Sequence, residues 1–346
     1  MRAMRVVPGL PDSAATVELA EPEPTAERPY VLESVLVGLC GTDRELLRRH
    51  PPASRVMTIG HESLARVVSA PGTGEHQPGD FVVGVIRQAC SQRCRGCLIG
   101  RFDLCLTRPI TERGIYGRDG FGSDRWTASE DALVQVPTDL GERGILVEPL
   151  TCLVKGRRRL LDAHRNVASS SVDRLLVSGA GPIGLLASWY FGQVFESVVL
   201  VDPFADAEAV AAAALLPSVE FVDTWADVER SRFDAFVECS GSIDAIISGL
   251  PLVLPAGTVV LEGICGSNGR ALPSAIIQSA VLNDLTILAT VNASHRDHLD
   301  AVEQLASAPV AFLDALTSRE ITPEDWPTWA IDDRPTGVKT VVRFQL

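Results

Sequence analysis

The chain has 346 residues, of which 46% are hydrophobic and 22% charged; this balance suits a folded protein of about two domains and excludes a disordered chain. Its formal net charge of -13 argues against a nucleic-acid partner and against an anionic membrane surface, because both require basic patches. The first residues lack an apolar signal region, and no apolar run approaches the ~20 residues of a membrane helix. We therefore expect a soluble, cytoplasmic protein with no membrane partner.

In the first 155 residues, short strand-like runs are separated by glycine, proline and other turn residues. These runs cover residues 31–38, 63–72 and 80–86. From residue 174 onward, apolar runs alternate with segments of helical length. The apolar runs lie at 175–178, 197–202, 219–223, 233–239, 258–264 and 285–291. Polar and apolar residues do not alternate within them, which indicates a parallel sheet covered by helices on both faces.

We expect an α/β protein in which a doubly wound parallel sheet, a Rossmann domain, is inserted into a β-rich domain. The β-rich domain would take residues 1–155 and the Rossmann domain residues 156–307. Residues 308–346 would return to the first domain. Near residue 308 the regular alternation of apolar runs and helical segments ends, and the chain finishes in the strand-like run KTVVRF.

The sequence GAGPIG fits the dinucleotide-binding pattern G-x-G-x-x-G, with an apolar run before it and a helical stretch after it. Gly179 would permit the tight turn, Gly181 would let the backbone approach the pyrophosphate, and Gly184 would let the helix pack close to the strand. The N–H groups at the start of the helix would face the phosphates. The residues expected to bind the cofactor here are Gly179, Gly181, Pro182, Ile183 and Gly184.

Asp202 ends the next apolar run, 18 positions after Gly184. A carboxylate at this point can accept hydrogen bonds from both ribose hydroxyls and would repel a 2′-phosphate. No arginine follows directly, since residues 203–205 are Pro, Phe and Ala. We therefore predict NAD as the cofactor, with NADP less favoured. The alternative is a glycine-rich turn that binds no cofactor, but strand, glycines, helix and acid would then coincide by chance.

Two groups of residues have the chemistry of zinc ligands. One is a set of four cysteines in a short polar segment, which can complete the closed tetrahedral shell of a structural zinc: Cys90, Cys94, Cys97 and Cys105. The other combines Cys40 with the His61–Glu62 pair, and would leave a coordination position open for catalysis. By spacing alone the second group is weak, because a single Cys or His more often belongs to a core.

Taken together, these motifs resemble the zinc-dependent medium-chain dehydrogenases over essentially the whole chain. The shared segments are G-x-C-G-T-D (38–43), G-H-E (60–62), the four-cysteine segment, V-E-P (147–149) and GAGPIG. Within that family the chain looks most like the glucose dehydrogenase branch. The segments that carry this closer likeness are CGTDRE (40–45), TERGIYGRDGF (111–121), LVEPL (146–150) and VNAS (291–294).

The resemblance implies that the first domain is a GroES-like catalytic domain with a catalytic zinc. Cys40 and His61 would be zinc ligands, and Glu62 would be a ligand or a close neighbour. Glu148 would bind the zinc directly or through water, and Thr42 would hydrogen-bond the reacting hydroxyl. Thr42 also fits a second role as a helix cap.

In the glucose dehydrogenase branch, the positions of Glu112 and Asn292 contact sugar hydroxyls. The alternative for Glu112 is an ion pair with Arg113 or Arg118, and the alternative for Asn292 is a simple turn position. The chain departs from the family in two respects. Three residues instead of two separate Cys90 from Cys94, and Cys152 stands where the branch often has a polar or acidic residue.

The implied reaction transfers a hydride between a secondary alcohol of a sugar, polyol or cyclitol and NAD, with one catalytic and one structural zinc. The family also implies a homodimer or homotetramer, often through the edge strand near residues 285–291. Two alternatives stay open: a cyclitol or modified-sugar dehydrogenase of a specialised biosynthetic pathway, and a catalytically silent NAD-binding regulator on the same fold. Retention of the full set of expected zinc ligands argues against the regulator.

Overall fold

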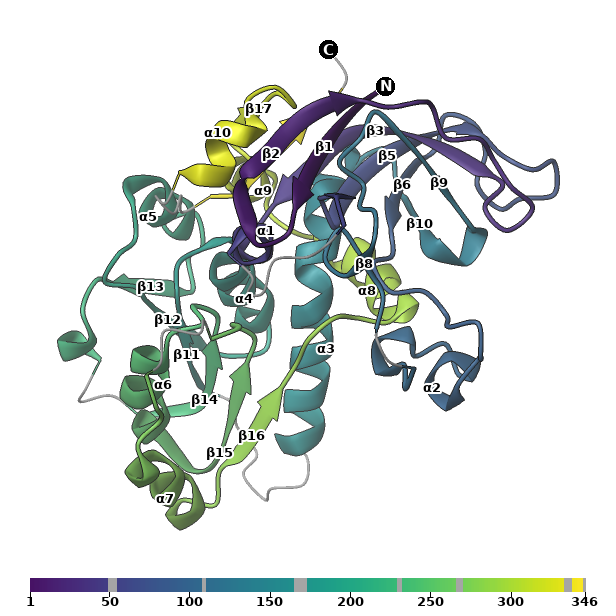
Figure 1. Cartoon of the computed structure of the whole chain (residues 1–346). Coiled ribbons are helices and arrows are strands. Elements are labelled where there is room, and N and C mark those ends of the chain that lie inside the picture. Colours follow the sequence, from purple (N-terminus) through teal and green to yellow (C-terminus); the bar gives the residue numbers. More distant parts are fainter. Residues whose placement is uncertain are drawn as a thin grey trace.

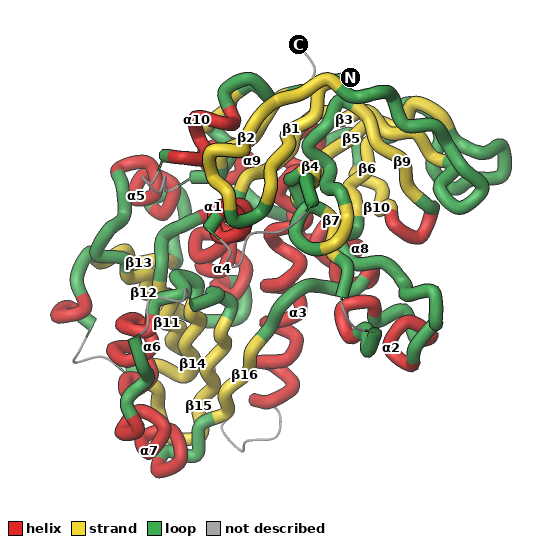
Figure 2. The backbone as a smooth tube through the Cα atoms, viewed as in Figure 1, coloured by secondary structure: helices red, strands yellow, loops and turns green. Residues whose placement is uncertain are grey.

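The computed structural model describes residues 1–48, 55–107, 110–164, 173–228, 232–265, 270–332 and 338–344. Two large sheets dominate the molecule, and the long helix α3 (Val147–His164) lies between them (Figure 1). The first strands and the last strand belong to the same β-rich half, so the chain leaves this half and returns to it (Figure 2). The α/β fold with an inserted parallel sheet is therefore confirmed.

The β-rich half contains a seven-stranded sheet and a three-stranded sheet. The strands of the larger sheet are β3 (Tyr30–Leu39), β5 (Glu62–Ser69), β6 (Phe81–Gly84), β9 (Arg125–Ala128), β10 (Leu133–Val136), β17 (Arg319–Ile321) and β18 (Thr340–Arg343). Their order is β10-β6-β5-β3-β18-β17, and β9 also pairs with β3. The smaller sheet contains β1 (Arg2–Val7), β2 (Leu10–Glu18) and β4 (Met57–Thr58), and a separate pair is formed by β7 (Glu112–Arg113) and β8 (Gly117–Arg118).

The inserted sheet is parallel throughout. Its strands are β11 (Arg174–Ser178), β12 (Ser197–Val201), β13 (Val219–Val222), β14 (Phe233–Glu238), β15 (Val253–Leu261) and β16 (Thr286–Ala289). The order β13-β12-β11-β14-β15-β16 is the 3-2-1-4-5-6 order of a Rossmann sheet. The strand order reverses between β11 and β14, so a dinucleotide is expected at the carboxyl ends of these two strands.

Helices cover the parallel sheet and complete the β-rich half. The remaining α-helices are α1 (Gly41–Leu47), α2 (Arg95–Leu98), α4 (Pro182–Gly192), α5 (Ala207–Ala213), α6 (Ile243–Gly249), α7 (Ser274–Leu282), α8 (His295–Leu305), α9 (Val310–Leu316) and α10 (Trp326–Ile331). Short 3-10 helices are formed by Phe102–Leu104, Glu130–Ala132, Gly141–Leu146, Trp225–Asp227 and Leu250–Leu252. No helix in the described ranges is long and apolar enough to cross a membrane.

The largest hydrophobic cluster extends from Val35 in the β-rich half to Leu200 in the parallel sheet, and buried leucines of α3 such as Leu153 belong to it. α3 thus supplies side chains to one continuous core. The expected limit between the first two domains, after residue 155, falls inside this helix. The sequence pattern did not indicate β1 and β2, which begin the chain, because half-exposed residues dominate β2.

Candidate active site

The Cys40–His61–Glu62 group comes together where β3 ends and β5 begins. The Sγ of Cys40 lies 3.0 Å from Nε2 of His61. One ligand atom from each of Cys40, His61 and Glu62 falls within 4.8 Å of the others. Antiparallel pairing of β3 with β5 places Gly38 opposite Glu62, so residues that are about 20 positions apart in sequence become neighbours.

Helix α1 fixes the position of Cys40. Cys40 is its N-cap residue, and the N–H group of Thr42 donates to its Sγ at 3.2 Å. The Asp43 carboxylate accepts from the Cys40 N–H at 2.9 Å, which completes a capping box. The same carboxylate lies 3.4 Å from Nδ1 of His61. Asp43 therefore orients both Cys40 and the imidazole.

Glu62 is held by a buried lysine that directly precedes the last strand. Lys339 Nζ donates to Glu62 Oε1 at 2.6 Å, and each side chain is only 2% exposed. The second oxygen, Oε2, is buried without a hydrogen-bond partner. It leaves no space for a side chain at Gly38, where a Cβ would overlap it. A buried carboxylate oxygen without a partner is the kind of donor that a metal ion satisfies.

Glu148 lies in the first turn of α3, outside the 4.8 Å group but close to it. Burial raises the pKa of Glu148 to about 7, although the charges of His61 and Lys339 oppose this shift. Burial lowers the pKa of His61, but the neighbouring Cys40 and Asp43 raise it well above its usual value. The donor set of one thiolate, one imidazole and nearby carboxylates fits a zinc ion with a free position.

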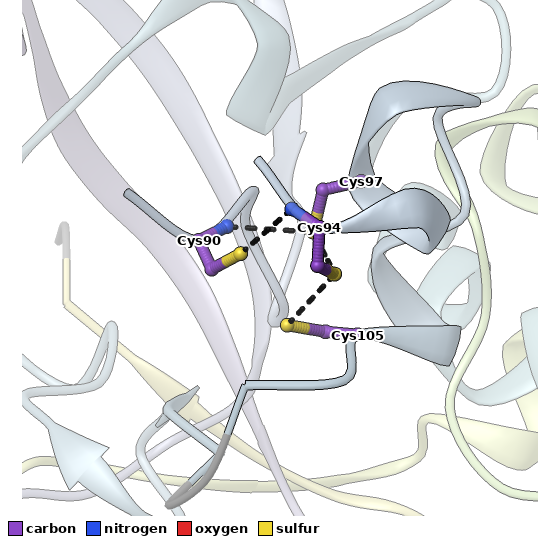
Figure 3. A group of neighbouring side chains, drawn as sticks. All are labelled: Cys90, Cys94, Cys97 and Cys105. Atoms are coloured by element: carbon purple, nitrogen blue, oxygen red, sulfur yellow. Dashed lines mark hydrogen bonds between the residues drawn. The ribbon is translucent and has the colours of Figure 1, made fainter. Parts of the chain in front are cut away.

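The four-cysteine segment forms a separate lobe around α2 (Figure 3). Its Sγ atoms all lie within 4.8 Å of one another; Cys94 is 3.6 Å from Cys97 and 3.9 Å from Cys105. Four thiolates 2.3 Å from a tetrahedral ion would be about 3.8 Å apart. The extra residue in the first gap is accommodated because Arg93 adopts a left-handed conformation, with φ of 44°.

Backbone N–H groups point at the sulfur atoms of this lobe. The Leu106 N–H donates to Cys94 Sγ at 3.3 Å, and the Cys94 N–H donates to Cys90 Sγ at 3.4 Å. Mainly through the Leu106 N–H, the pKa of Cys94 is lowered to about 6. Hydrogen bonds to sulfur favour the thiolate, which is the form that binds zinc.

The glycine turn follows β11 as the sequence predicts, and each glycine has a distinct environment. Gly179 has φ of +90°, and a Cβ there would lie 2.9 Å from Ser240. A Cβ at Gly184 would overlap the carbonyl oxygen of Gly179, whereas Gly181 faces open space. Gly181 is the N-cap of α4, and Pro182 and Ile183 form its first turn. The turn therefore leaves a free approach to the N-terminus of α4, where a phosphate is stabilised.

Asp202 and Glu238 hold the loops on either side of this turn. Asp202 Oδ2 accepts from the Ala180 N–H at 2.7 Å, and Oδ1 accepts from the Phe204 N–H at 2.8 Å. Glu238 is fully buried at the end of β14 and accepts from the N–H groups of Ser240 at 2.7 Å and Gly241 at 3.1 Å. Two carboxylates thus organise the crevice at the point where the strand order reverses.

Glu112 and Asn292, which are 180 positions apart, meet directly. Asn292 Nδ2 donates to Glu112 Oε1 at 2.5 Å, and Arg87 Nε donates to the same oxygen at 2.8 Å. The ion-pair partner of Glu112 is therefore Arg87, and not Arg113 or Arg118. Gly114, near Glu112, approaches Gly60 so closely that a Cβ would overlap its carbonyl oxygen, and Gly60 precedes the zinc-ligand candidate His61.

Sequence reasoning missed several functional side chains. Lys339 and Glu238 both stand inside apolar runs, where a charged residue is unusual and would have been the signal of a buried partner. Asp43 stands in the G-x-C-G-T-D segment, but its contact with His61 depends on the pairing of two strands. Arg87 gave no local signal.

Two family models together cover most of the chain. Residues 141–344 match the model described as glucose dehydrogenase C-terminus, and residues 28–138 match the alcohol dehydrogenase GroES-like domain. The glucose 1-dehydrogenase of Metallosphaera sedula is 30% identical over 357 aligned residues, which cover 99% of this chain and 98% of the relative. The chain belongs to the zinc-dependent medium-chain dehydrogenases, in the glucose dehydrogenase-like branch. It is an NAD(P)-dependent oxidoreductase that acts on CH–OH groups and depends on zinc.

Other members of the family have the same fold. The glucose 1-dehydrogenase of Thermoproteus tenax is 30% identical and aligns with 89% of this chain and 88% of the relative. The structure of Haloferax mediterranei glucose dehydrogenase in complex with NADP, Zn and gluconolactone has a TM-score of 0.87 at 23% identity, with both chains covered completely. The fold predicted from the sequence is therefore confirmed by solved structures as well as by the topology described above.

Proposed function

We propose that this medium-chain dehydrogenase oxidises a hydroxyl of a sugar with NAD as the hydride acceptor, using zinc held by Cys40, His61 and Glu62. The observation that carries the proposal is the convergence of this thiol, imidazole and carboxylate within 4.8 Å. The two relatives cited above are named glucose 1-dehydrogenases, and the Haloferax structure contains gluconolactone. A sugar substrate agrees with these names and with the polar pair Glu112–Asn292.

Each residue of the site has a distinct part in this proposal. When bound, zinc would act as a Lewis acid that lowers the pKa of the substrate hydroxyl. Thr42, in the first turn of α1, would accept a hydrogen bond from the substrate hydroxyl and release its own hydroxyl proton as it takes up that of the substrate. Glu148, whose pKa of about 7 lets it carry or release a proton near neutrality, would take the proton onward. Glu112 and Asn292 would bind the sugar hydroxyls away from the reacting carbon.

The zinc assignment is tested by Cys40→Ala and His61→Ala. Each variant is expected to lose catalytic zinc and turnover of sugar while it retains NAD binding, measured by metal analysis, initial rates and calorimetry. Cys265→Ala is the matched control, because Cys265 is exposed and is remote in sequence from both cysteine groups. Full turnover by a metal-free preparation would contradict the proposal.

A screen of aldoses, polyols and cyclitols for NAD reduction would define the substrate.

The preference for NAD rests on Asp202. Its carboxylate is anchored at the end of β12, beside the glycine turn, and it would repel a 2′-phosphate. The Haloferax structure contains NADP, so the two proteins would differ in this respect. Asp202→Asn should raise kcat/KM for NADP relative to NAD, by at least about tenfold if one close charge is removed. A wild-type enzyme that prefers NADP would contradict this assignment.

We propose a second, structural zinc in the four-cysteine lobe. Its support is the spacing of the sulfur atoms and their backbone N–H donors. Metal analysis should give two zinc ions per chain, and Cys97→Ser should remove one of them without loss of the catalytic ion. A wild-type chain that holds only one zinc ion, in the catalytic site, would contradict a structural zinc in the lobe.

We also propose a homodimer that pairs through strand β16. This strand is at the edge of the parallel sheet, and Ile287 on it is 42% exposed. Val281 and Leu282 at the end of α7 are 74% and 77% exposed, so an apolar surface accompanies the edge. Exposed edges of this kind are normally covered. Ile287→Lys should produce monomers in light scattering, and a monomeric wild type would contradict the dimer.

A further inference from the structure

Asp103 lies in the four-cysteine lobe, between Cys97 and Cys105, and yet its contacts reach out of the lobe. Its side chain is 0% exposed. Within the lobe, Arg101 donates to both carboxylate oxygens, at 2.8 and 2.7 Å. The remaining contacts of Asp103 are made outside the lobe, with Arg87 in the loop after β6 and with Lys155 of α3. We call the contacts that continue from these two residues the first arm and the second arm.

The first arm leaves from the backbone of Asp103. Its carbonyl oxygen accepts from Nη1 of Arg87 at 2.6 Å. The same guanidinium donates through Nε to Glu112 at 2.8 Å. Because the guanidinium is planar and rigid, a displacement of Asp103 is transmitted directly to Glu112.

The second arm leaves from the side chain of Asp103. Lys155 Nζ, on α3, donates to Asp103 Oδ2 at 2.8 Å. Its other two contacts are the carbonyl oxygens of Val291 and Asn292, at 3.1 and 3.2 Å. The three donors of the ammonium group are therefore all used. They hold a segment in which Asn292 adopts a left-handed conformation, with φ of 56°.

The two arms close at Glu112, where the Asn292 amide donates to the oxygen that also accepts from Arg87. The result is a closed ring of five residues from the lobe, the β-rich half, α3 and the parallel-sheet half: Asp103, Arg87, Glu112, Asn292 and Lys155. All the contacts of the ring are buried or part-buried, and each of the five involves a charged side chain, which makes them stronger than neutral hydrogen bonds.

We propose that Asp103 is a positioning residue for the sugar, and that the four-cysteine lobe acts through it to set the orientation of Glu112 and Asn292. This inference rests on the proposed function of that pair. None of the described contacts of Asp103 involves a zinc ligand of the active site or the cofactor turn. Its removal should therefore weaken sugar binding and leave NAD binding and the catalytic ion in place.

The experiment compares Asp103→Asn, Lys155→Met and Glu112→Gln with D-glucose as the probe sugar. Asp103→Asn and Lys155→Met should each raise KM for the sugar about tenfold, as expected for one misplaced charged hydrogen bond. We expect kcat and the dissociation constant of NAD to change less than about threefold. Asp314→Asn is the matched control, because it breaks the exposed ion pair with Arg143 and should leave KM unchanged.

A double-mutant cycle separates positioning from general support. If Asp103 acts through the Glu112–Asn292 pair, Asp103→Asn should raise KM by a smaller factor in the Glu112→Gln background than in the wild type. Additive effects, or an unchanged KM in Asp103→Asn when Glu112→Gln raises it, would overturn the inference. An unchanged KM in Glu112→Gln would instead overturn the proposed substrate contact. If Asp103→Asn fails to fold, the same cycle with Lys155→Met decides.

Discussion

At the scale of single residues, Gly181 and Gly184 look alike in the sequence and have opposite surroundings. A Cβ at Gly184 would overlap the Gly179 carbonyl, so Gly184→Ala should destabilise the fold by about 1–3 kcal/mol. Gly181→Ala should leave the melting temperature unchanged and weaken NAD binding, because its Cβ would occupy the space left for the pyrophosphate. Thermal melts and NAD titrations measure both effects. Equal loss of stability in the two variants would contradict this division of roles.

Glu262 predicts a dependence of stability on pH. Thr290 donates to its Oε2, but Oε1 is buried without a partner, and burial raises the pKa of Glu262 to about 7. The carboxyl group is ionised more easily in the unfolded chain, so its contribution to stability declines as the pH rises from about 4.5 to 7. Glu262→Gln should therefore stabilise the protein by roughly 1–3 kcal/mol at pH 8 and by almost nothing at pH 4.5. Urea unfolding at the two pH values tests this, and a gain of equal size at both would refute it.

The residue scale also shows where prediction from sequence ends. The turn at GAGPIG lies between a strand and a helix as predicted, because such a turn depends on local backbone geometry. The meeting of Glu112 with Asn292 depends on how two halves of the chain pack, and Arg87 as the partner of Glu112 was not foreseen. The same limit applies to Lys339, which lies 277 positions after Glu62 and directly before β18.

At the scale of elements, α1 is a short helix whose capping box also supports the metal site. Asp43 holds the Cys40 backbone and lies against His61. Asp43→Asn should lower zinc affinity about 10–100-fold, the usual effect of removing a carboxylate that orients a histidine ligand. Glu45→Gln, an exposed acid on the same helix, is the control and should leave the affinity unchanged. Titration with a competing chelator gives both values; an unaffected Asp43→Asn would contradict this role.

The central strands of the parallel sheet were predicted with good agreement, because burial on both faces makes each of them a continuous apolar run. β14 lies within the run at 233–239, and β11 exceeds the run at 175–178 only by Arg174. Elements with little burial or few residues gave no such signal. β2 is half exposed, and α2 has only four residues and is shaped by the cysteines around it.

At the scale of the whole molecule, α3 makes the two halves parts of one core. Leu153 of α3 is fully buried in the cluster that includes Val35 and Leu200. Calorimetry should therefore give one unfolding transition, and Leu153→Ala should lower its midpoint by the equivalent of about 2–5 kcal/mol without splitting it. Leu98→Ala, at a leucine that is 65% exposed, is the control. Two separate transitions in the wild type would show that the halves unfold independently.

The chain contains only two lysines, Lys155 and Lys339, and both are buried, at 5% and 2% exposure. A protease that cleaves only after lysine therefore meets no site on the native surface, and its rate of cleavage reports how often the core opens. Reagents that acylate amines likewise meet both of these lysines only when the core opens, so the rate of lysine acylation reports the same motion.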